Sequence, residues 1–297
     1  MLQPRFPPPT YNKAVNILLV FCFLANANAQ WVDPTRNRKI AVTVIGQGRG
    51  GNPFLLFFPP PGAAVSDYRP LLQLLSGYTV VFVQPQYSRA AWENSSRLPV
   101  SGQIAFERQE MRDWVKDGLF ILSRMKAATA GVFGHGAGGM AAAAACQISS
   151  AFRACLDMDG ETMGSPFVLD LPFDQPFLWL RPLRVAPPPP TDAELKDRQI
   201  TREEYDLIMS KSGLASMWKS RRIATVVTLY AKDAGYASFT GRGVGTRSFD
   251  LARTVIGEFF DEHLKGRKSP LFSGLTTGYA EVVYQQFRTT PIRATAP

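Results

Sequence analysis

Histidine and cysteine are scarce in this chain of 297 residues, which contains two histidines and three cysteines. With so few of these residues and no cluster at ligand spacing, the sequence predicts no metal site and no cofactor. Charged residues are also sparse, at 19%, whereas 45% of the residues are hydrophobic. This composition argues against a disordered chain or a repeat architecture. The length suits one large α/β domain with a sizeable core, preceded by a leader.

Acidic residues are outnumbered by basic ones, 24 to 33, which gives a formal net charge of +9. The basic residues are spread along the chain, and neither a basic stripe nor a recognition motif accompanies them. We therefore interpret the charge as a solvated surface and expect no nucleic-acid partner. Weak attraction to anionic surfaces would give at most peripheral membrane contact. No sequence feature indicates an oligomeric state.

Residues 1–29 have the features of a signal peptide. Arg5 and Lys13 supply a positive segment, residues 14–24 form an almost uninterrupted apolar run, and residues 25–29 offer an A-x-A cleavage site. We therefore predict export, either periplasmic or secreted, with a mature chain that begins near Gln30. An uncleaved membrane anchor is the alternative, but the apolar run is shorter than the roughly 20 residues that cross a bilayer.

Two of the three cysteines, Cys146 and Cys155, lie outside this leader. An even number of cysteines in an exported protein permits a disulfide. Cys146 falls in a predicted alanine-rich helix and Cys155 in a predicted apolar strand, where buried free thiols behave as small hydrophobic side chains. We favour two free thiols, with a bridge as the alternative. The third cysteine, Cys22, suggests a lipoprotein signal only weakly, because Phe21 precedes it where a small residue is expected.

From Lys39 onward, short β-rich runs alternate with segments of helical spacing. The predicted strands are 40–45, 54–58, 78–83, 130–133, 151–160 and 224–230. The predicted helices are 68–75, 103–126, 140–146 and 249–264. Such βαβα alternation predicts the α/β class, with a mostly parallel sheet that carries helices on both faces.

The predicted domain, 30–268, contains a small helical cap insertion at about 165–222. A proline run introduces the insertion, and Thr191 followed three residues later by Glu194 forms a capping box that predicts a helix start. Residues 269–297 form a C-terminal tail that we expect to be a loop.

The segment after the predicted strand 130–133 reads Gly134-His-Gly-Ala-Gly138. It resembles the nucleophile elbow of α/β-hydrolases, G-x-S-x-G, in which the serine lies on a strained turn between a strand and a helix. The serine position is Gly136. A phosphate-binding turn is the alternative for such a glycine-rich loop, but neither the G-x-G-x-x-G pattern nor a ribose-binding acid is present.

Four segments in order extend the resemblance across residues 40–267. They read GHGAGG at 134–139, FRACLDMDG at 152–160, DAGYASFT at 233–240 and FFDEHLKG at 259–266. The chain is similar to exported bacterial α/β-hydrolases that resemble platelet-activating-factor acetylhydrolase, a family of carboxylic ester hydrolases. Residues 191–207 resemble the cap segment of that family. The resemblance implies the α/β-hydrolase fold.

The resemblance also implies where a Ser-Asp-His triad would lie. The nucleophile position falls on Gly136, the acid on Asp159 and the histidine, in a segment like G-x-H-x-S-F, on Tyr236. The backbone N–H of Ala137 is the expected oxyanion donor. Should the strand remain extended through Asp159, Asp157 would share its face, although the family pattern assigns chemistry to Asp159 alone.

Two of the three catalytic functions are therefore missing from the sequence. Glycine has no nucleophilic atom, and a tyrosine with a pKa of about 10 is a poor base at neutral pH. His135 and His263 are expected to be structural histidines. We predict an inactive relative of esterases whose inherited cleft is a candidate site for an ester, a lipid or a partner; a degenerate homologue that retains no ligand is one alternative. The other alternative is an active hydrolase of short-acyl or phospholipid-like esters that uses a non-standard residue.

Overall fold

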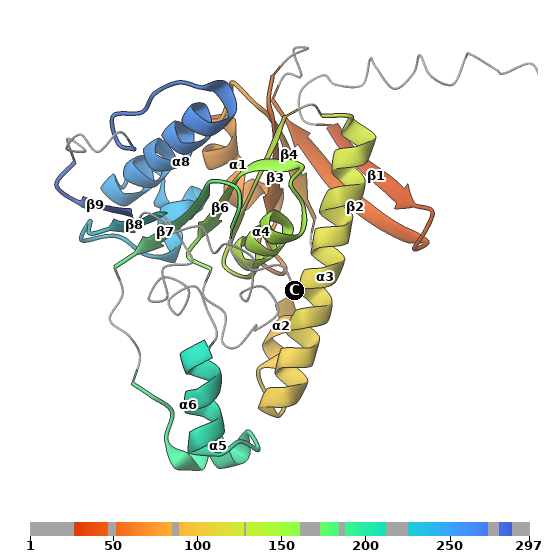
Figure 1. The fold of residues 1–297 in the computed structure, drawn as a ribbon, viewed down its shortest axis with the longest axis vertical. Helices are drawn as coiled ribbons and strands as arrows, with labels where there is room; N and C mark the ends of the chain where they lie inside the picture. The colour runs from red at the N-terminus through yellow and green to blue at the C-terminus, as the bar shows by residue number, and fades with distance from the viewer. Residues whose placement is uncertain are drawn as a thin grey trace, which may run out of the picture.

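A nine-stranded sheet forms the centre of the protein (Figure 1). The computed structural model describes residues 27–46, 52–84, 89–127, 129–160, 173–183, 188–211, 225–272 and 279–286. The strands lie in the order β1-β2-β4-β3-β5-β6-β7-β8-β9, and the six from β4 to β8 are parallel. Their bounds are β1 Ala27–Asp33, β2 Arg38–Ile45, β3 Phe54–Phe58, β4 Thr79–Val83, β5 Ala130–His135, β6 Phe152–Met158, β7 Phe177–Pro182, β8 Thr225–Leu229 and β9 Val282–Gln286.

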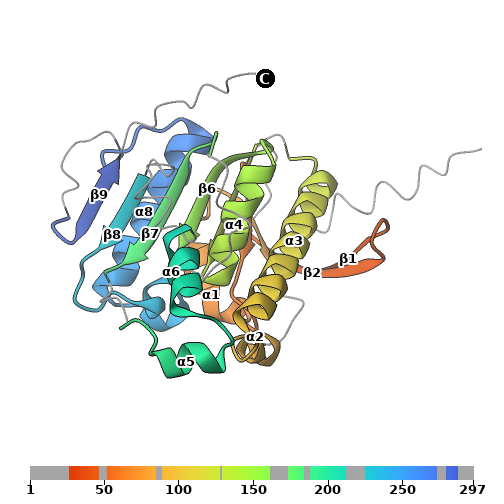
Figure 2. The same cartoon turned by 60° about the horizontal axis from the view of Figure 1, so that its bottom comes forward.

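Helices cover both faces of this sheet, as Figure 2 shows. One face packs against α3 (Val100–Met125) and α4 (Ala137–Ile148), and the other packs against α1 (Val65–Gln73) and α8 (Arg247–Lys265). The short helix α2 (Arg89–Ser95) precedes α3. The predicted α/β class and the mostly parallel sheet with helices on both faces are confirmed.

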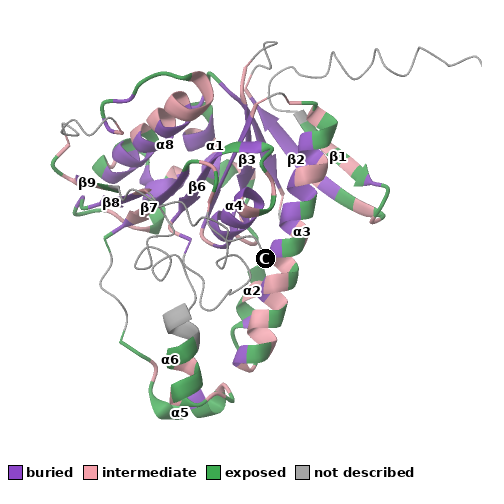
Figure 3. Ribbon diagram, viewed as in Figure 1, coloured by how far each residue is buried: buried purple, intermediate pink, exposed green. Residues whose placement is uncertain are grey.

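Alternation along the central strands explains why they are apolar without interruption. In β3, Phe54, Leu56 and Phe58 belong to the core beneath α3 and α4. Leu55 and Phe57 belong to the core beneath α1 and α8. A strand that is covered on both faces has no solvent side for polar residues, so all five side chains are buried (Figure 3).

The insertion is partly as expected. Thr191 caps α5 (Asp192–Asp197), since its hydroxyl accepts from Glu194 N and the Glu194 carboxylate accepts from Thr191 N, which confirms the capping box. A second helix, α6 (Arg202–Lys211), follows, and Figure 1 draws the pair below the sheet. However, β7 lies inside the predicted range 165–222 and is a strand of the central sheet.

Both ends of the sheet extend beyond the predicted strands. The segment expected to be a loop after residue 269 contains β9, which pairs antiparallel with β8. At the other end, β1 pairs antiparallel with β2 and begins at Ala27. Cleavage before Gln30 would therefore fall inside β1, while the rest of the predicted leader lies outside the described residues. Within the described ranges, none of the helices is both long and apolar enough to cross a membrane.

The two cysteines beyond the leader form a disulfide, so the preference for free thiols was wrong. Cys146 near the end of α4 is bonded to Cys155 in β6, and both residues are fully buried. Residue spacing could not decide between the alternatives, because the distance between the two thiols depends on how α4 packs on β6.

Candidate functional site

The turn between β5 and α4 holds Gly136 in a backbone conformation that residues with side chains rarely adopt. Its φ is 57° and its ψ is −125°. Gly136 N donates to Met158 O (2.9 Å), and Gly136 O accepts from Gly139 N (2.9 Å). The first bond ties the turn to the end of β6, and the second starts α4. The turn therefore has the strand-turn-helix form of a nucleophile elbow.

The flanking glycines permit two close backbone contacts. A Cβ atom at Gly134 would lie 2.1 Å from Gly138 O, and one at Gly138 would lie 2.1 Å from Phe58 O. Both contacts are with backbone atoms and cannot be relieved by rotating a side chain. These two glycines thus allow α4 to begin directly against the ends of β3 and β5.

Gly136 itself has room for a side chain. A Cβ atom there would have one neighbour within 4 Å, Pro60 Cβ, at 3.8 Å, which is an ordinary van der Waals contact. The space for a nucleophile is therefore present, but the nucleophilic atom is not. Only the backbone conformation would oppose a larger residue at this position.

The loop after β3 lies beside the elbow and provides few hydrogen-bond donors. In α/β-hydrolases this loop supplies the second N–H of the oxyanion hole. Here residues 59–61 are prolines and have no N–H. Ala63 N donates to Pro60 O (3.2 Å) and Ala64 N donates to Asp67 Oδ2 (3.0 Å). Gly62 keeps its N–H, and the N–H of Ala137, the first residue of α4 and without an acceptor inside the helix, is the expected oxyanion donor.

Asp159 lies next to the elbow, immediately after β6. It is half-buried, its φ is 54°, and its N–H donates to Leu180 O (2.8 Å). Because the strand ends at Met158 and Asp159 has a left-handed conformation, the chain is not extended through both aspartates. Asp157 is instead fully buried, and its Oδ1 accepts from Gly160 N (2.6 Å). Asp157 thus stabilises the turn that presents Asp159.

Tyr236 begins the 3-10 helix η2 (Tyr236–Phe239) and reaches the elbow from the loop after β8. Its ring lies 4.1 Å from the His135 ring, centroid to centroid. The Tyr68 hydroxyl is hydrogen-bonded to Tyr236 and to His135 Nδ1, the latter at 2.6 Å. Burial is the main cause that raises the pKa of Tyr236, and the charge of Asp159 raises it further. Tyr236 therefore remains protonated at neutral pH and does not replace a basic histidine.

The two histidines have different surroundings, and neither takes the place of the missing base. His135 is fully buried beneath Tyr236 and is hydrogen-bonded to the Tyr68 hydroxyl. His263, near the end of α8, packs on Phe259 with ring centroids 4.7 Å apart. Its neighbour Leu264 approaches Gly131, at the start of β5. Gly136 lies about 16 Å from Gly131 along β5, so His263 lies near the amino ends of the parallel strands, opposite the elbow.

The structure therefore brings the three predicted positions together at the carboxyl ends of the parallel strands. Tyr236 contacts His135, the residue before Gly136. Gly136 N donates to Met158 O, and Asp159 is the next residue after Met158. The charge of Asp159 also acts on Tyr236. Sequence reasoning missed Tyr68, because its position in a helical pattern indicates packing only. Within the described part of the chain, no group of three or more His, Cys, Asp or Glu could hold a metal ion.

Two solved structures with this architecture are an esterase and a peptidase. A ferulic acid esterase from Streptomyces cinnamoneus matches with a TM-score of 0.61 and 18% identity, over 88% of this chain and 95% of the esterase. The fold is that of the α/β-hydrolases. An acylaminoacyl peptidase from Pyrococcus horikoshii matches with a TM-score of 0.52 and 15% identity, over 89% of this chain and 45% of the peptidase. No family model and no curated protein sequence matches this chain.

Proposed function

We propose that this protein is an exported relative of the ester hydrolases that has lost serine-hydrolase activity and binds an ester or lipid at the elbow. The observation that carries the proposal is Gly136, which has the backbone conformation of a nucleophile, has space for a side chain and has no atom to attack with. Tyr236 at the histidine position and the prolines of the loop after β3 point the same way.

Loss of two catalytic groups removes the usual route to an acyl-enzyme. A serine hydrolase needs an oxygen nucleophile, a base that takes its proton and donors that stabilise the oxyanion. This site has an acid position, Asp159, and one expected donor, Ala137 N–H. Donors without a nucleophile bind a carbonyl oxygen but form no covalent intermediate.

Exposed apolar side chains at the same edge of the sheet support an apolar ligand. Leu183 follows β7, Tyr230 follows β8, and the two turns are joined by the bond from Leu183 N to Leu229 O (2.8 Å). Both side chains are about half exposed, like that of Tyr236. An acyl chain or aromatic acid that lies across the elbow could bury these surfaces, and each buried Å² of apolar area stabilises a complex by about 25 cal/mol.

The disulfide supports the export part of the proposal. Disulfides persist in oxidising compartments such as the periplasm and the extracellular medium, and they are rare in the cytosol. N-terminal sequencing of the protein recovered from the producing cells tests this part. A mature chain that begins between residues 27 and 31, found outside the cytoplasm, is expected. A cytoplasmic chain that retains residues 1–26 would refute export.

The activity test combines a fluorophosphonate probe with p-nitrophenyl acetate turnover. The wild-type protein should show neither labelling nor turnover above a heat-inactivated sample. Labelling of the wild type would show that a non-standard residue serves as nucleophile, and the proposal of inactivity would be wrong.

A reactivated variant tests the assignment of positions. Gly136→Ser together with Tyr236→His should become labelled and hydrolyse p-nitrophenyl acetate, whereas each single variant should show far less activity, because nucleophile and base act as a unit. The variant with Asp159→Asn added should lose the gain. A folded double variant that the probe does not label would contradict the assignment.

A further inference from the structure

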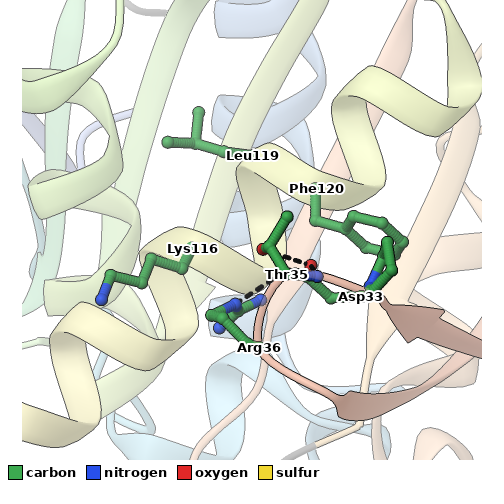
Figure 4. Close-up of a pocket in the computed structure, with 7 residues that line it drawn as sticks. Asp33, Thr35, Arg36, Lys116, Leu119 and Phe120 are labelled. Atoms are coloured by element: carbon green, nitrogen blue, oxygen red, sulfur yellow. Dashed lines mark hydrogen bonds and ion pairs between the residues drawn. The ribbon is translucent and has the colours of Figure 1, made fainter.

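A pocket lies far from the elbow, between the β1–β2 turn and the C-terminal half of α3 (Figure 4). Its volume is about 550 Å³. Residues 33–36 of the turn form one wall, and Lys116, Leu119 and Phe120 of α3 form the other. The pocket borders the edge strand β1, whereas the elbow follows the end of β5, three strands away from β2 in the sheet. Its volume lies within the range of small-molecule sites.

Ion pairs hold the two walls of this pocket in place. Arg36 donates through Nε to Asp33 Oδ2 (2.6 Å) and through Nη2 to Asp117 Oδ1 (2.8 Å). Arg38 Nε also donates to Asp117 Oδ1 (2.9 Å). Asp117 is on α3 and is buried, so these bonds fasten the hairpin to the helix. A pocket whose walls are fixed before binding requires little ordering when a ligand arrives.

The charges around the pocket leave a positive excess. Both oxygens of Asp33 are already engaged, one by Thr35 and the other by Arg36. Arg36 Nη1 is buried and has no hydrogen-bond partner among the described residues, whereas Lys116 is exposed and forms no ion pair with them. On α3, Glu110 precedes Lys116 by about 9 Å along the helix axis, and Asp113 precedes it by about 4.5 Å. Asp33 is the carboxylate in the pocket wall, and because both of its oxygens are engaged, an incoming anion would meet the Lys116 ammonium as the unpaired charge of the lining.

The remaining lining is apolar. Pro34 of the turn and the adjacent residues Leu119 and Phe120 of α3 form this apolar part, and Figure 4 shows the two α3 side chains. Phe120 and Leu119 are both only partly buried, so a ligand can cover area that the fold leaves accessible. A flat ring gains most from such a wall, because it contacts the Phe120 ring by stacking or edge to face.

We propose that this pocket binds a small amphipathic anion, a carboxylate attached to one apolar ring, with the carboxylate at Lys116 and Arg36 and the ring against Phe120 and Leu119. The site is independent of the elbow and requires no catalytic group. A ligand of opposite charge should be excluded by the same cations.

Three probes of similar shape test the proposal on the full-length protein: benzoate, benzyl alcohol and benzylamine. Isothermal titration calorimetry should give one saturable site for benzoate, weaker binding for benzyl alcohol and the weakest for benzylamine. Lys116→Gln should weaken the binding of benzoate about fivefold, as expected for an exposed charge, and leave the binding of benzyl alcohol unchanged. Phe120→Ala should weaken both. Arg124→Gln, an exposed cation farther along the same helix and outside the pocket, is the matched control and should change neither.

Three outcomes would overturn the proposal. Benzoate that shows no saturation at 10 mM, or that binds Lys116→Gln and Arg124→Gln equally well, would show that the pocket does not select anions. Benzoate binding that is lost in Tyr236→Ala but kept in Lys116→Gln would place the ligand at the elbow, a result that would support the proposed function and refute this inference. Circular dichroism of each variant verifies that the fold is intact.

Discussion

Replacing Gly136 by alanine measures the backbone strain that the elbow imposes on any residue with a side chain. The added Cβ would have Pro60 Cβ as its one neighbour within 4 Å, at 3.8 Å, so a steric clash does not contribute. A residue held at φ 57° and ψ −125° costs about 1–3 kcal/mol. Alanine also restricts the unfolded chain, which offsets about 0.4–1 kcal/mol of that cost.

A matched variant, Gly257→Ala, removes this second contribution. Gly257 lies within α8, where an added Cβ atom would have no neighbour within 4 Å and where the helical backbone is one that alanine prefers. The variant should become more stable by about 0.5–1 kcal/mol. Because both changes restrict the unfolded chain alike, the difference between the two variants isolates the strain at Gly136, about 1–3 kcal/mol.

Urea denaturation followed by circular dichroism measures both free energies of unfolding, provided that the slopes agree among the variants. Thermal unfolding should give a parallel result, with about 2–4 °C for each kcal/mol. If Gly136→Ala were as stable as Gly257→Ala, the turn would not be held in the conformation of a nucleophile. Gly136 could then not be assigned to the nucleophile position.

Two further predictions concern Glu107 and the disulfide. Burial raises the pKa of Glu107 to about 7, so between pH 4.5 and 7 the folded state holds a proton that the unfolded state has released. The free energy of unfolding of the wild type, relative to that of Glu107→Gln, should therefore fall by roughly 3 kcal/mol as the pH rises through this window. A difference in urea denaturation that does not depend on pH would refute the assignment. For the disulfide, thiol titration of the unfolded, unreduced mature protein should detect no free thiol, and Cys146→Ala with Cys155→Ala should lower the free energy of unfolding by about 2–3 kcal/mol; two titratable thiols would contradict the pairing.

Much of the sheet was predictable because its central strands are buried on both faces. β3 was predicted with the bounds that the structure has, since its five apolar residues are followed directly by Pro59. β7 was missed because prolines at 176 and 182 border its short apolar run, and the run was assigned to the insertion. β9 lies at the edge of the sheet, where half-exposed residues such as Tyr284 give no clear pattern.

The candidate site was predictable in its positions but not in its contacts. The glycines of the elbow and Asp159 follow strands that the sequence indicates, so their common edge could be inferred from a parallel sheet. The bond between Tyr68 and Tyr236 joins α1 to the loop after β8, and no local pattern encodes it. The disulfide was likewise undecided because it depends on the packing of α4 against β6.

The three prolines after β3 would limit the activity of the Gly136→Ser, Tyr236→His variant. Restoring serine and histidine would recreate the nucleophile and its base, but the oxyanion would still lack donors from residues 59–61. Loss of one oxyanion donor lowers kcat by about 10²–10³ in serine hydrolases. Efficient catalysis by that variant would therefore require a second donor from outside residues 59–61, or a substitution within them.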